Sequence, residues 1–230
     1  MLSLFNNKCY KAGNPKKLVI FIHGYNGSPE AIDYARQWLH AKLQDSVLIV
    51  PRAPFPCEKD VNNLQWLSFY EEDPQVRFRN PEASTEEIFD IFNRLGNSFA
   101  HVAEQMNQFI SEQQSLYGID DKNTFIMGFS QGAMISIYTA LTRNKQLGGC
   151  ISIAGIITGM SRLENEIVSR PPFLLLHGKA DVTVQYKTYP LTVDWLEKHN
   201  IQPEKHTFEG LEHRMSEEEM QIVAEFINAR

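Results

Sequence analysis

Short apolar runs alternate along the chain with longer segments in which apolar residues recur every three or four positions. Each run is four to six residues long and rich in Val, Ile and Leu, which is typical of a strand buried on both faces of a sheet. The longer segments have the period of amphipathic helices. The predicted strands are residues 18–23, 47–50, 124–128, 149–154, 173–177 and 205–208.

Helix boundaries are indicated by capping residues. Helices are predicted at residues 28–43, 84–117, 131–143 and 186–199, with a last one from residue 216. Ser28 before Pro29 marks the start of the first helix, and the Ser-x-x-Glu spacings at residues 84–87 and 216–219 predict capping boxes. Gly118 ends the second helix, and Gly96 is expected to split or bend it.

Buried strands separated by amphipathic helices predict an α/β fold, with a mostly parallel central sheet and helices on both faces. A length of 230 residues suits a single domain over residues 1–230. Ligands of such sheets bind at the carboxyl ends of the strands. The residues that follow strands 18–23, 124–128 and 173–177 are therefore the first candidates for chemistry.

Residues 51–83 form a long predicted loop that carries five prolines. Long structureless loops in compact domains usually have a function, and this loop contains the apolar segment Leu64–Tyr70. Trp66, Leu67 and Phe69 are candidates for a lid or for the wall of an acyl pocket. The alternative is that these three side chains only anchor the loop to the core.

Ser130 is the candidate nucleophile. The segment Gly-Phe-Ser-Gln-Gly at residues 128–132 places a serine between two glycines, where a strand is predicted to turn into a helix. This is the context of a nucleophile elbow, in which a strained turn exposes the hydroxyl above the sheet. A serine that merely caps the following helix is the alternative, but a cap requires neither glycine.

A serine nucleophile needs a histidine base and a carboxylate that orients it, in the chain order serine, acid, histidine. Asp181 lies just after strand 173–177, whereas Asp194 lies within a predicted helix. His213 lies on a loop between the last strand and the last helix, while His199 and His206 fall on a helix end and within a strand. We therefore expect Asp181 and His213 to complete the site; an ordinary turn aspartate and a surface histidine are the alternatives.

The oxyanion of an attacked carbonyl requires two converging backbone N–H groups. The glycine-rich residues after the first strand and the start of helix 131–143 predict Tyr25 and Gln131 as these donors. His23 and His177 each precede a glycine at a strand end, but the chain order excludes them as the base. We expect both to be structural, satisfying backbone groups of the loops.

Charge and cysteine content narrow the classes of partner. A net charge of −6 without a dense basic segment argues against nucleic-acid binding. The N-terminal residues lack the pattern of a signal peptide, and the apolar runs are too short for a membrane anchor. Three scattered cysteines suggest neither disulfides nor a zinc site, so a reducing cytoplasm is expected.

Taken in order, the segments FIHGYNG, APFP with QWLSF, GFSQGA, HGKADVTV and GLEHRMS resemble the phospholipase/carboxylesterase family of α/β-hydrolases. That family includes bacterial carboxylesterases and acyl-protein thioesterases. The resemblance implies an α/β-hydrolase fold, the triad Ser130, Asp181 and His213, the donors Tyr25 and Gln131, and no cofactor or metal. Two positions depart from the family pattern: Tyr25-Asn26-Gly27 replaces Leu-Gly-Asp, and Gln185 stands where a proline is common.

The expected activity is that of a serine carboxylesterase acting on short to medium acyl chains of small-molecule or lipid esters. An acyl-protein thioesterase or a lysophospholipase would use the same triad. A non-catalytic binding protein with a hydrolase fold is a weaker alternative, and a homodimer stays open.

Overall fold

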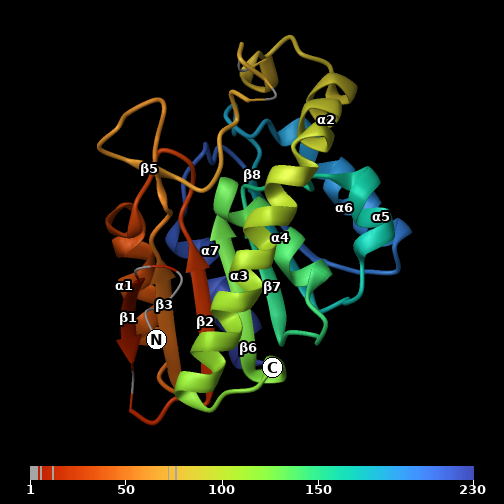
Figure 1. Ribbon diagram of the computed structural model, residues 1–230. Coiled ribbons are helices and arrows are strands. Elements are labelled where there is room, and N and C mark those ends of the chain that lie inside the picture. The colour runs from red at the N-terminus through yellow and green to blue at the C-terminus, as the bar shows by residue number, and fades with distance from the viewer. Residues whose placement is uncertain (1–4, 6, 12, 72, 76) are drawn as a thin grey trace.

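A seven-stranded sheet forms the centre of the molecule, in a computed structural model that describes residues 5, 7–11, 13–71, 73–75 and 77–230 (Figure 1). Its strand order is β1-β3-β2-β6-β7-β8-β9. All neighbours are parallel except β1 and β3. The strands are β1 (Asn7–Lys11), β2 (Lys17–Ile22), β3 (Ser46–Pro51), β6 (Thr124–Phe129), β7 (Gly149–Ile153), β8 (Phe173–Gly178) and β9 (Glu204–Phe208).

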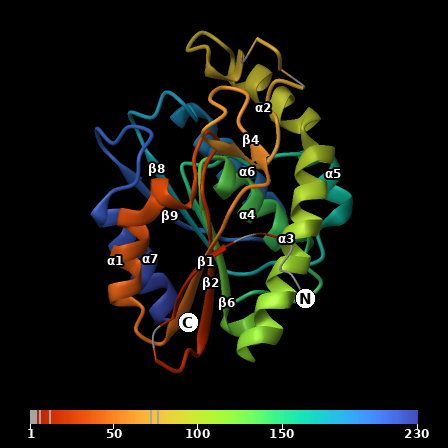
Figure 2. The ribbon, with the colours of Figure 1, turned by 60° about the vertical axis from the view of Figure 1, so that its left-hand side comes forward.

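Helices cover both faces of this sheet, which confirms the predicted fold class. Figure 2 shows α1 and α7 on one side of the strands and α3 on the other. The helices are α1 (Asp33–Lys42), α2 (Thr85–Arg94), α3 (Gly96–Tyr117), α4 (Gln131–Thr142), α5 (Met160–Glu166), α6 (Tyr189–Lys198) and α7 (Glu217–Asn228). No helix in the described part of the chain has both the length and the hydropathy needed to span a membrane.

The sheet separates two apolar clusters, and β2 supplies alternate side chains to each. Leu18 and Ile20 belong to the cluster under α3 and α4, whereas Val19 and Phe21 belong to the cluster under α1 and α7. All four side chains are fully buried. A strand with two buried faces therefore appears in the sequence as a continuous apolar run.

Strand β1 and helix α5 were not predicted from the sequence. Strand β1 pairs antiparallel with β3 at the edge of the sheet, and its residues are exposed or only partly buried, so it lacks an apolar run. Helix α5 has seven residues, too few to produce a clear hydrophobic period.

The start of the first helix was predicted wrongly in detail. Pro29–Ile32 form a 3₁₀ turn, and α1 begins only at Asp33; the Ser28 side chain makes no capping hydrogen bond. Likewise, Tyr186–Thr188 form a 3₁₀ turn before α6. Other predicted boundaries are confirmed: Gly118 ends α3 with a left-handed backbone, and α3 begins at Gly96 after the break that follows α2.

The segment 51–83 lies above the carboxyl ends of the strands, over the arrowhead of β2 in Figure 1. Its described residues after β3 form the short strands β4 (Phe55–Pro56) and β5 (Leu64–Gln65) and the 3₁₀ turn η2 (Arg77–Arg79). Glu72 and Val76 within it are outside the described residues. The rest of the segment is fixed to the core by an aromatic cluster, in which Phe69 contacts Phe78 at 5.2 Å between ring centroids and Phe78 contacts Phe92 at 5.3 Å.

Gly132 is required by the contact between α4 and β2, and this gives a first prediction. A Cβ atom at this position would lie 2.1 Å from the Ile22 carbonyl oxygen and 2.7 Å from that of His23. Gly132→Ala must push α4 off the sheet, so we expect the free energy of unfolding to fall by more than about 3 kcal/mol. Urea unfolding followed by circular dichroism measures this loss.

Gly118→Ala is the matched control. A Cβ there has no neighbour within 4 Å, and only the left-handed backbone is strained. Its cost should be about 1 kcal/mol. Equal losses in the two variants would show that the close contact of α4 with β2 is not the constraint.

Candidate active site

Ser130 lies at the sharp junction of β6 and α4. Its backbone has φ 56° and ψ −120°, a strained conformation for a residue with a side chain. The Ser130 N–H donates to the Ile153 carbonyl oxygen at 2.9 Å, which helps to hold the turn. A Cβ at Gly128 would lie 2.2 Å from the Gly132 carbonyl group, so the turn also depends on this glycine.

Ser130, His213 and Asp181 form one chain of hydrogen bonds. His213 Nε2 lies 3.0 Å from Ser130 Oγ, and His213 Nδ1 lies 2.7 Å from Asp181 Oδ2. The Ser130 side chain makes no capping hydrogen bond to α4, so the interpretation of this serine as a helix cap is wrong. The structure thus brings together the three residues that the sequence singled out, from the ends of β6, β8 and β9.

The Asp181 carboxylate is fully buried but well supplied with donors. Its Oδ1 accepts from the N–H groups of Thr183 at 2.8 Å and Val184 at 3.0 Å. Burial by itself would raise the pKa of Asp181, but hydrogen bonds from His177 and His213 outweigh it and lower that pKa below its usual range. The carboxylate is therefore negatively charged at neutral pH and can orient the His213 imidazole.

His177 was expected to be structural, and it does bond to a loop: its Nε2 donates to the Val184 carbonyl oxygen at 2.9 Å. The same nitrogen lies 3.4 Å from Asp181 Oδ2, a contact that the sequence analysis missed. The spacing of four residues across the end of a strand was the available signal. His177 and His213 therefore both approach the same carboxylate oxygen of Asp181.

His23 is structural in the way the sequence predicts. Its Nδ1 donates to the Gly24 carbonyl oxygen at 2.9 Å, and its Nε2 accepts from the Ala53 N–H at 3.2 Å. A single neutral tautomer satisfies both bonds. Burial lowers the pKa of His23 to about 4, so the ring is uncharged at neutral pH.

The loop that carries His213 connects β9 to α7 and packs against the ends of β6 and β8. The imidazole packs on the Phe129 ring with 4.7 Å between ring centroids. The Ala180 N–H donates to the Leu211 carbonyl oxygen at 3.0 Å, and a Cβ at Gly178 would lie 2.1 Å from that same oxygen. Gly178 thus permits the close approach of the His213 loop to the Asp181 turn.

The predicted oxyanion donors lie on both sides of Ser130. A Cβ at Gly24 would lie 3.2 Å from Ser130 Cβ, so the backbone leading into Tyr25 runs directly beside the serine. Among the described residues the Tyr25 N–H has no acceptor. Gln131 is the first residue of α4, and its N–H has no preceding helical turn to bond. Both groups are therefore available to a ligand.

Trp66, Leu67 and Phe69 are buried and fasten the loop to this site. The Trp66 indole N–H donates to the His23 carbonyl oxygen at 2.9 Å. The Gln131 side chain accepts from the Trp66 N–H and donates to the Leu67 carbonyl oxygen, both at 3.0 Å. Trp66 thus acts as the anchor that the sequence analysis gave as the alternative. Phe69 lies against the Tyr25 ring with 5.2 Å between centroids.

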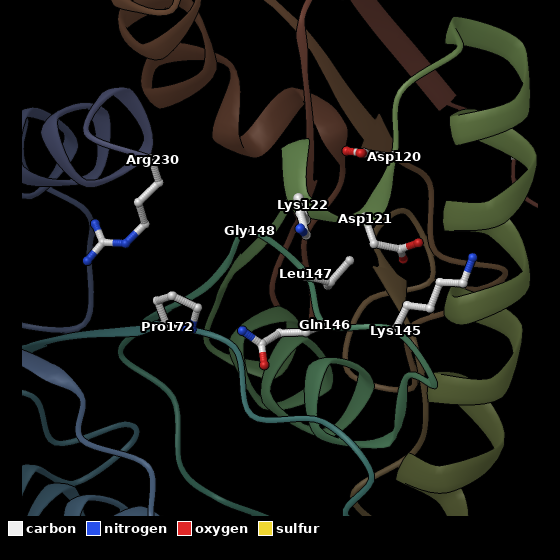
Figure 3. A pocket seen from close by; sticks show the side chains of 9 residues that line it. All are labelled: Asp120, Asp121, Lys122, Lys145, Gln146, Leu147, Gly148, Pro172 and Arg230. Carbon is white, nitrogen blue, oxygen red and sulfur yellow. The ribbon is translucent and has the colours of Figure 1, made fainter.

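A cavity of about 660 Å³ lies at the opposite, amino-terminal end of the strands (Figure 3). Lys122, Gly148 and Pro172 come just before β6, β7 and β8. The charged ends of Lys145 and Arg230 point away from each other, so the basic side chains do not converge on one point. Across the described chain, no group of three or more His, Cys, Asp or Glu side chains is arranged to hold a metal ion.

The start of α7, directly after the His213 loop, yields a prediction about pH. The Glu219 carboxylate accepts from the Ser216 N–H at 2.7 Å, in a capping box that confirms the sequence prediction. Burial raises the pKa of Glu219 from an ordinary value of 4.5 to about 7, against the hydrogen bonds from Ser216. Between these values the folded chain holds a proton that the unfolded chain releases, so stability falls as the pH rises.

Glu219→Gln keeps the capping acceptor but cannot ionise. From pH 5 to pH 8 the wild type should lose on the order of 2 to 3 kcal/mol more free energy of unfolding than this variant. Urea titrations at several pH values measure the difference, with the exposed neighbour Glu218→Gln as control. The stability of the control Glu218→Gln should follow the pH dependence of the wild type. The prediction is contradicted if the stability of Glu219→Gln follows it as well.

Comparison with known proteins agrees with this geometry. The sequence model described as phospholipase/carboxylesterase matches residues 9–230. Acyl-protein thioesterase 1 homolog 1 from Dictyostelium discoideum is 34% identical over 216 residues, which are 91% of this chain and 88% of that protein. Carboxylesterase SOBER1 from Arabidopsis thaliana is 22% identical over 222 residues, which are 94% of this chain and 91% of that protein.

Solved structures share the fold. The crystal structure of esterase PE8 has a TM-score of 0.81 at 23% identity and covers 98% of both chains. That of Arabidopsis thaliana SOBER1 has a TM-score of 0.76 at 21% identity, covering 93% of this chain and 98% of that one. With nearly the whole sequence matched by the family model and a third of its residues shared with the Dictyostelium protein, the chain belongs to the phospholipase/carboxylesterase family.

Proposed function

We propose that the protein is a serine hydrolase that cleaves carboxylic esters through an acyl-enzyme intermediate, with Ser130 as nucleophile. The observation that carries the proposal is the 3.0 Å contact between Ser130 Oγ and His213 Nε2. A hydroxyl is a weak nucleophile unless a base within hydrogen-bond reach removes its proton. Membership of the phospholipase/carboxylesterase family supports the same class of reaction.

In the proposed mechanism, Ser130 Oγ attacks the ester carbonyl carbon while His213 Nε2 takes the hydroxyl proton. Asp181 holds Nδ1 at 2.7 Å, fixes the tautomer and stabilises the imidazolium that forms. The N–H groups of Tyr25 and Gln131 bind the oxyanion. His213 then protonates the leaving alcohol, and a water molecule, activated by the same imidazole, releases the acid from Ser130.

The positive end of the α4 dipole supports this assignment of the oxyanion site. Helix α4 begins at Gln131, directly after the nucleophile. The N-terminus of a helix favours the negative charge that develops on the attacked carbonyl oxygen. Preorganised donors of this kind are usually the largest single contribution to acyl transfer, and one of them is worth about two to three powers of ten in rate.

For the acyl group we propose contact with the 51–83 segment, through Leu67 and Phe69. Phe69 already packs against Tyr25, beside the proposed oxyanion donor. A cavity of about 810 Å³ adjoins Trp66 and Leu67 on the side of α3, and part of its lining is apolar. We propose short to medium acyl chains on small-molecule or lipid esters, and a cytoplasmic location, since Cys9, Cys57 and Cys150 are all free thiols.

A thioesterase activity toward acylated proteins is the second candidate. It is favoured by the 34% identity to a protein named as an acyl-protein thioesterase homolog. A thioester carbonyl is attacked through the same tetrahedral intermediate, so the same residues would serve. The two functions differ in the alcohol or thiol that leaves and in the length of the acyl chain.

The direct test is hydrolysis of p-nitrophenyl esters from acetate to palmitate by the wild type and by Ser130→Ala. We expect the variant to lose about four to six powers of ten in kcat, because the nucleophile and its partners act as a unit. Ser136→Ala is the matched control: this buried serine lies on the same helix and donates to the Gly132 carbonyl oxygen at 2.8 Å. It should stay within a few-fold of the wild type.

Equal rates in the wild type and a folded Ser130→Ala variant would refute the assignment of the nucleophile. Among active samples, a maximum at short chains supports a small-ester carboxylesterase. Rates that rise toward palmitate, or a higher kcat/KM for palmitoyl thioesters than for the matching oxygen esters, favour the thioesterase.

A further inference from the structure

Arg79 is the last residue of the η2 turn, at the end of the 51–83 segment, and its backbone is tied to the Asp181 turn. The Gln185 side-chain amide donates to the carbonyl oxygens of Phe78 and Asn80, both at 2.9 Å. The Tyr186 N–H in turn donates to the Asp181 carbonyl oxygen at 3.1 Å. Arg79 is therefore held between two hydrogen bonds from the turn that carries the proposed catalytic acid.

Its guanidinium reaches from there to the other side of the site. The Arg79 Cζ atom lies 5.6 Å from the centroid of the Tyr25 ring. Tyr25 follows Gly24, whose backbone runs directly beside Ser130. The arginine thus spans from the Asp181 turn to Tyr25, the two segments that flank the serine, and lies at the rim of the proposed active site.

The positive charge of Arg79 has no negative partner in the described chain. The side chain is half-buried, and its Nε is buried without a hydrogen-bond acceptor. Arg77, two residues earlier on the same turn, is paired with Asp73 at 3.1 Å and with Glu87 at 3.5 Å. Buried polar groups are nearly always satisfied, so the open donors of Arg79 call for an acceptor that the described residues do not supply.

The carboxylate of Glu58 lies near the same tyrosine but is not the acceptor for Arg79. Glu58 Oε1 accepts from the Tyr25 hydroxyl at 3.3 Å and from the Ser68 hydroxyl at 2.9 Å, and its Oε2 accepts from the Gln65 amide. The Arg79 guanidinium lies instead over two aromatic rings, with Cζ 5.6 Å from the Tyr25 centroid and 5.4 Å from the Phe78 centroid. A cation–π contact of this kind helps to place a guanidinium and leaves its N–H groups free to bind an anion.

We propose that Arg79 is a specificity-determining residue that binds an anionic group, a carboxylate or a phosphate, carried by the ester substrate. This inference rests on the proposed function, since the anion is recognised while Ser130 attacks the ester. Two parallel N–H groups of a guanidinium fit two oxygens of either anion. The preferred substrates are then esters that carry a negative charge within reach of the rim.

The experiment compares kcat/KM for charged and neutral esters of matched size. Mono-p-nitrophenyl succinate, glutarate and adipate carry the carboxylate on the acyl side and are matched by p-nitrophenyl butyrate, valerate and hexanoate. On the leaving side, 4-acetoxybenzoate and 4-acetoxyphenyl phosphate are matched by 4-acetoxybenzamide. The ratio of kcat/KM for each charged ester to that for its neutral match is measured for the wild type, Arg79→Met, Arg79→Lys and Arg170→Met. Arg170 is exposed, lies before β8 at the far end of the sheet, and controls for the change in net charge.

We expect at least one charged-to-neutral ratio to fall by about 10- to 100-fold in Arg79→Met, with a smaller fall in Arg79→Lys and none in Arg170→Met. The ester that responds identifies a carboxylate or a phosphate and the side of the ester that carries it. The wild-type ratio for that ester should fall as the salt concentration rises.

The proposal is overturned if every charged-to-neutral ratio of kcat/KM is the same in the wild type and in Arg79→Met. A purely structural arginine would give that result, because loss of loop packing slows the charged and the neutral ester alike. Failure of the proposed function has a different signature. In that case the neutral esters are not hydrolysed by the wild type, or they are hydrolysed equally by Ser130→Ala.

Discussion

The left-handed backbone at Ser130 is the constraint on which the site depends. A residue with a side chain adopts this conformation only when its surroundings enforce it, at a cost of about 1 to 3 kcal/mol. Here the enforcing contacts are the Ile153 carbonyl oxygen and the packing of Gly132 against the backbone of β2. The strain is thus balanced by the same helix-to-sheet contact that buries the apolar clusters, so that fold and site are stabilised together.

Parallel topology brings the other two residues of the hydrogen-bonded chain to this serine. Asp181 and His213 follow β8 and β9, whose carboxyl ends lie at the same edge of the sheet as that of β6. Gly178 lets the two turns approach, and His177 lies 3.4 Å from the carboxylate oxygen that His213 also contacts. Burial alone would raise the pKa of Asp181, but the hydrogen bonds from His177 and His213 lower it below its usual range. The geometry of the proposed catalysis is therefore a consequence of strand order together with a few close backbone contacts.

The sequence predicted the parts that follow from local pattern. Ser130, Asp181 and His213 stand at strand ends with glycines or caps beside them, and the structure joins them by hydrogen bonds. Strand β1 was not predicted, because a half-exposed edge strand has no apolar run. The role of Trp66 as an anchor could not be decided from the sequence, because it depends on the His23 carbonyl oxygen, 43 residues away along the chain. Contacts between residues that are distant in sequence leave no periodic pattern, so they become visible only in the folded structure.

The 51–83 segment is a second case in which the sequence pattern predicts an element but not its contacts. Its prolines and aromatic residues predict a functional loop, yet they do not say what the loop contributes. In the folded chain, the cluster of Phe69, Phe78 and Phe92 fixes the segment on the core. Gln185, at a position where the resemblance noted in the sequence implies a proline, ties the end of the segment to the Asp181 turn. A proline has no side-chain amide to make these bonds. The two hydrogen bonds from Gln185 thus fix the backbone on either side of Arg79, and the proposed preference for charged esters requires no change in the proposed catalytic residues.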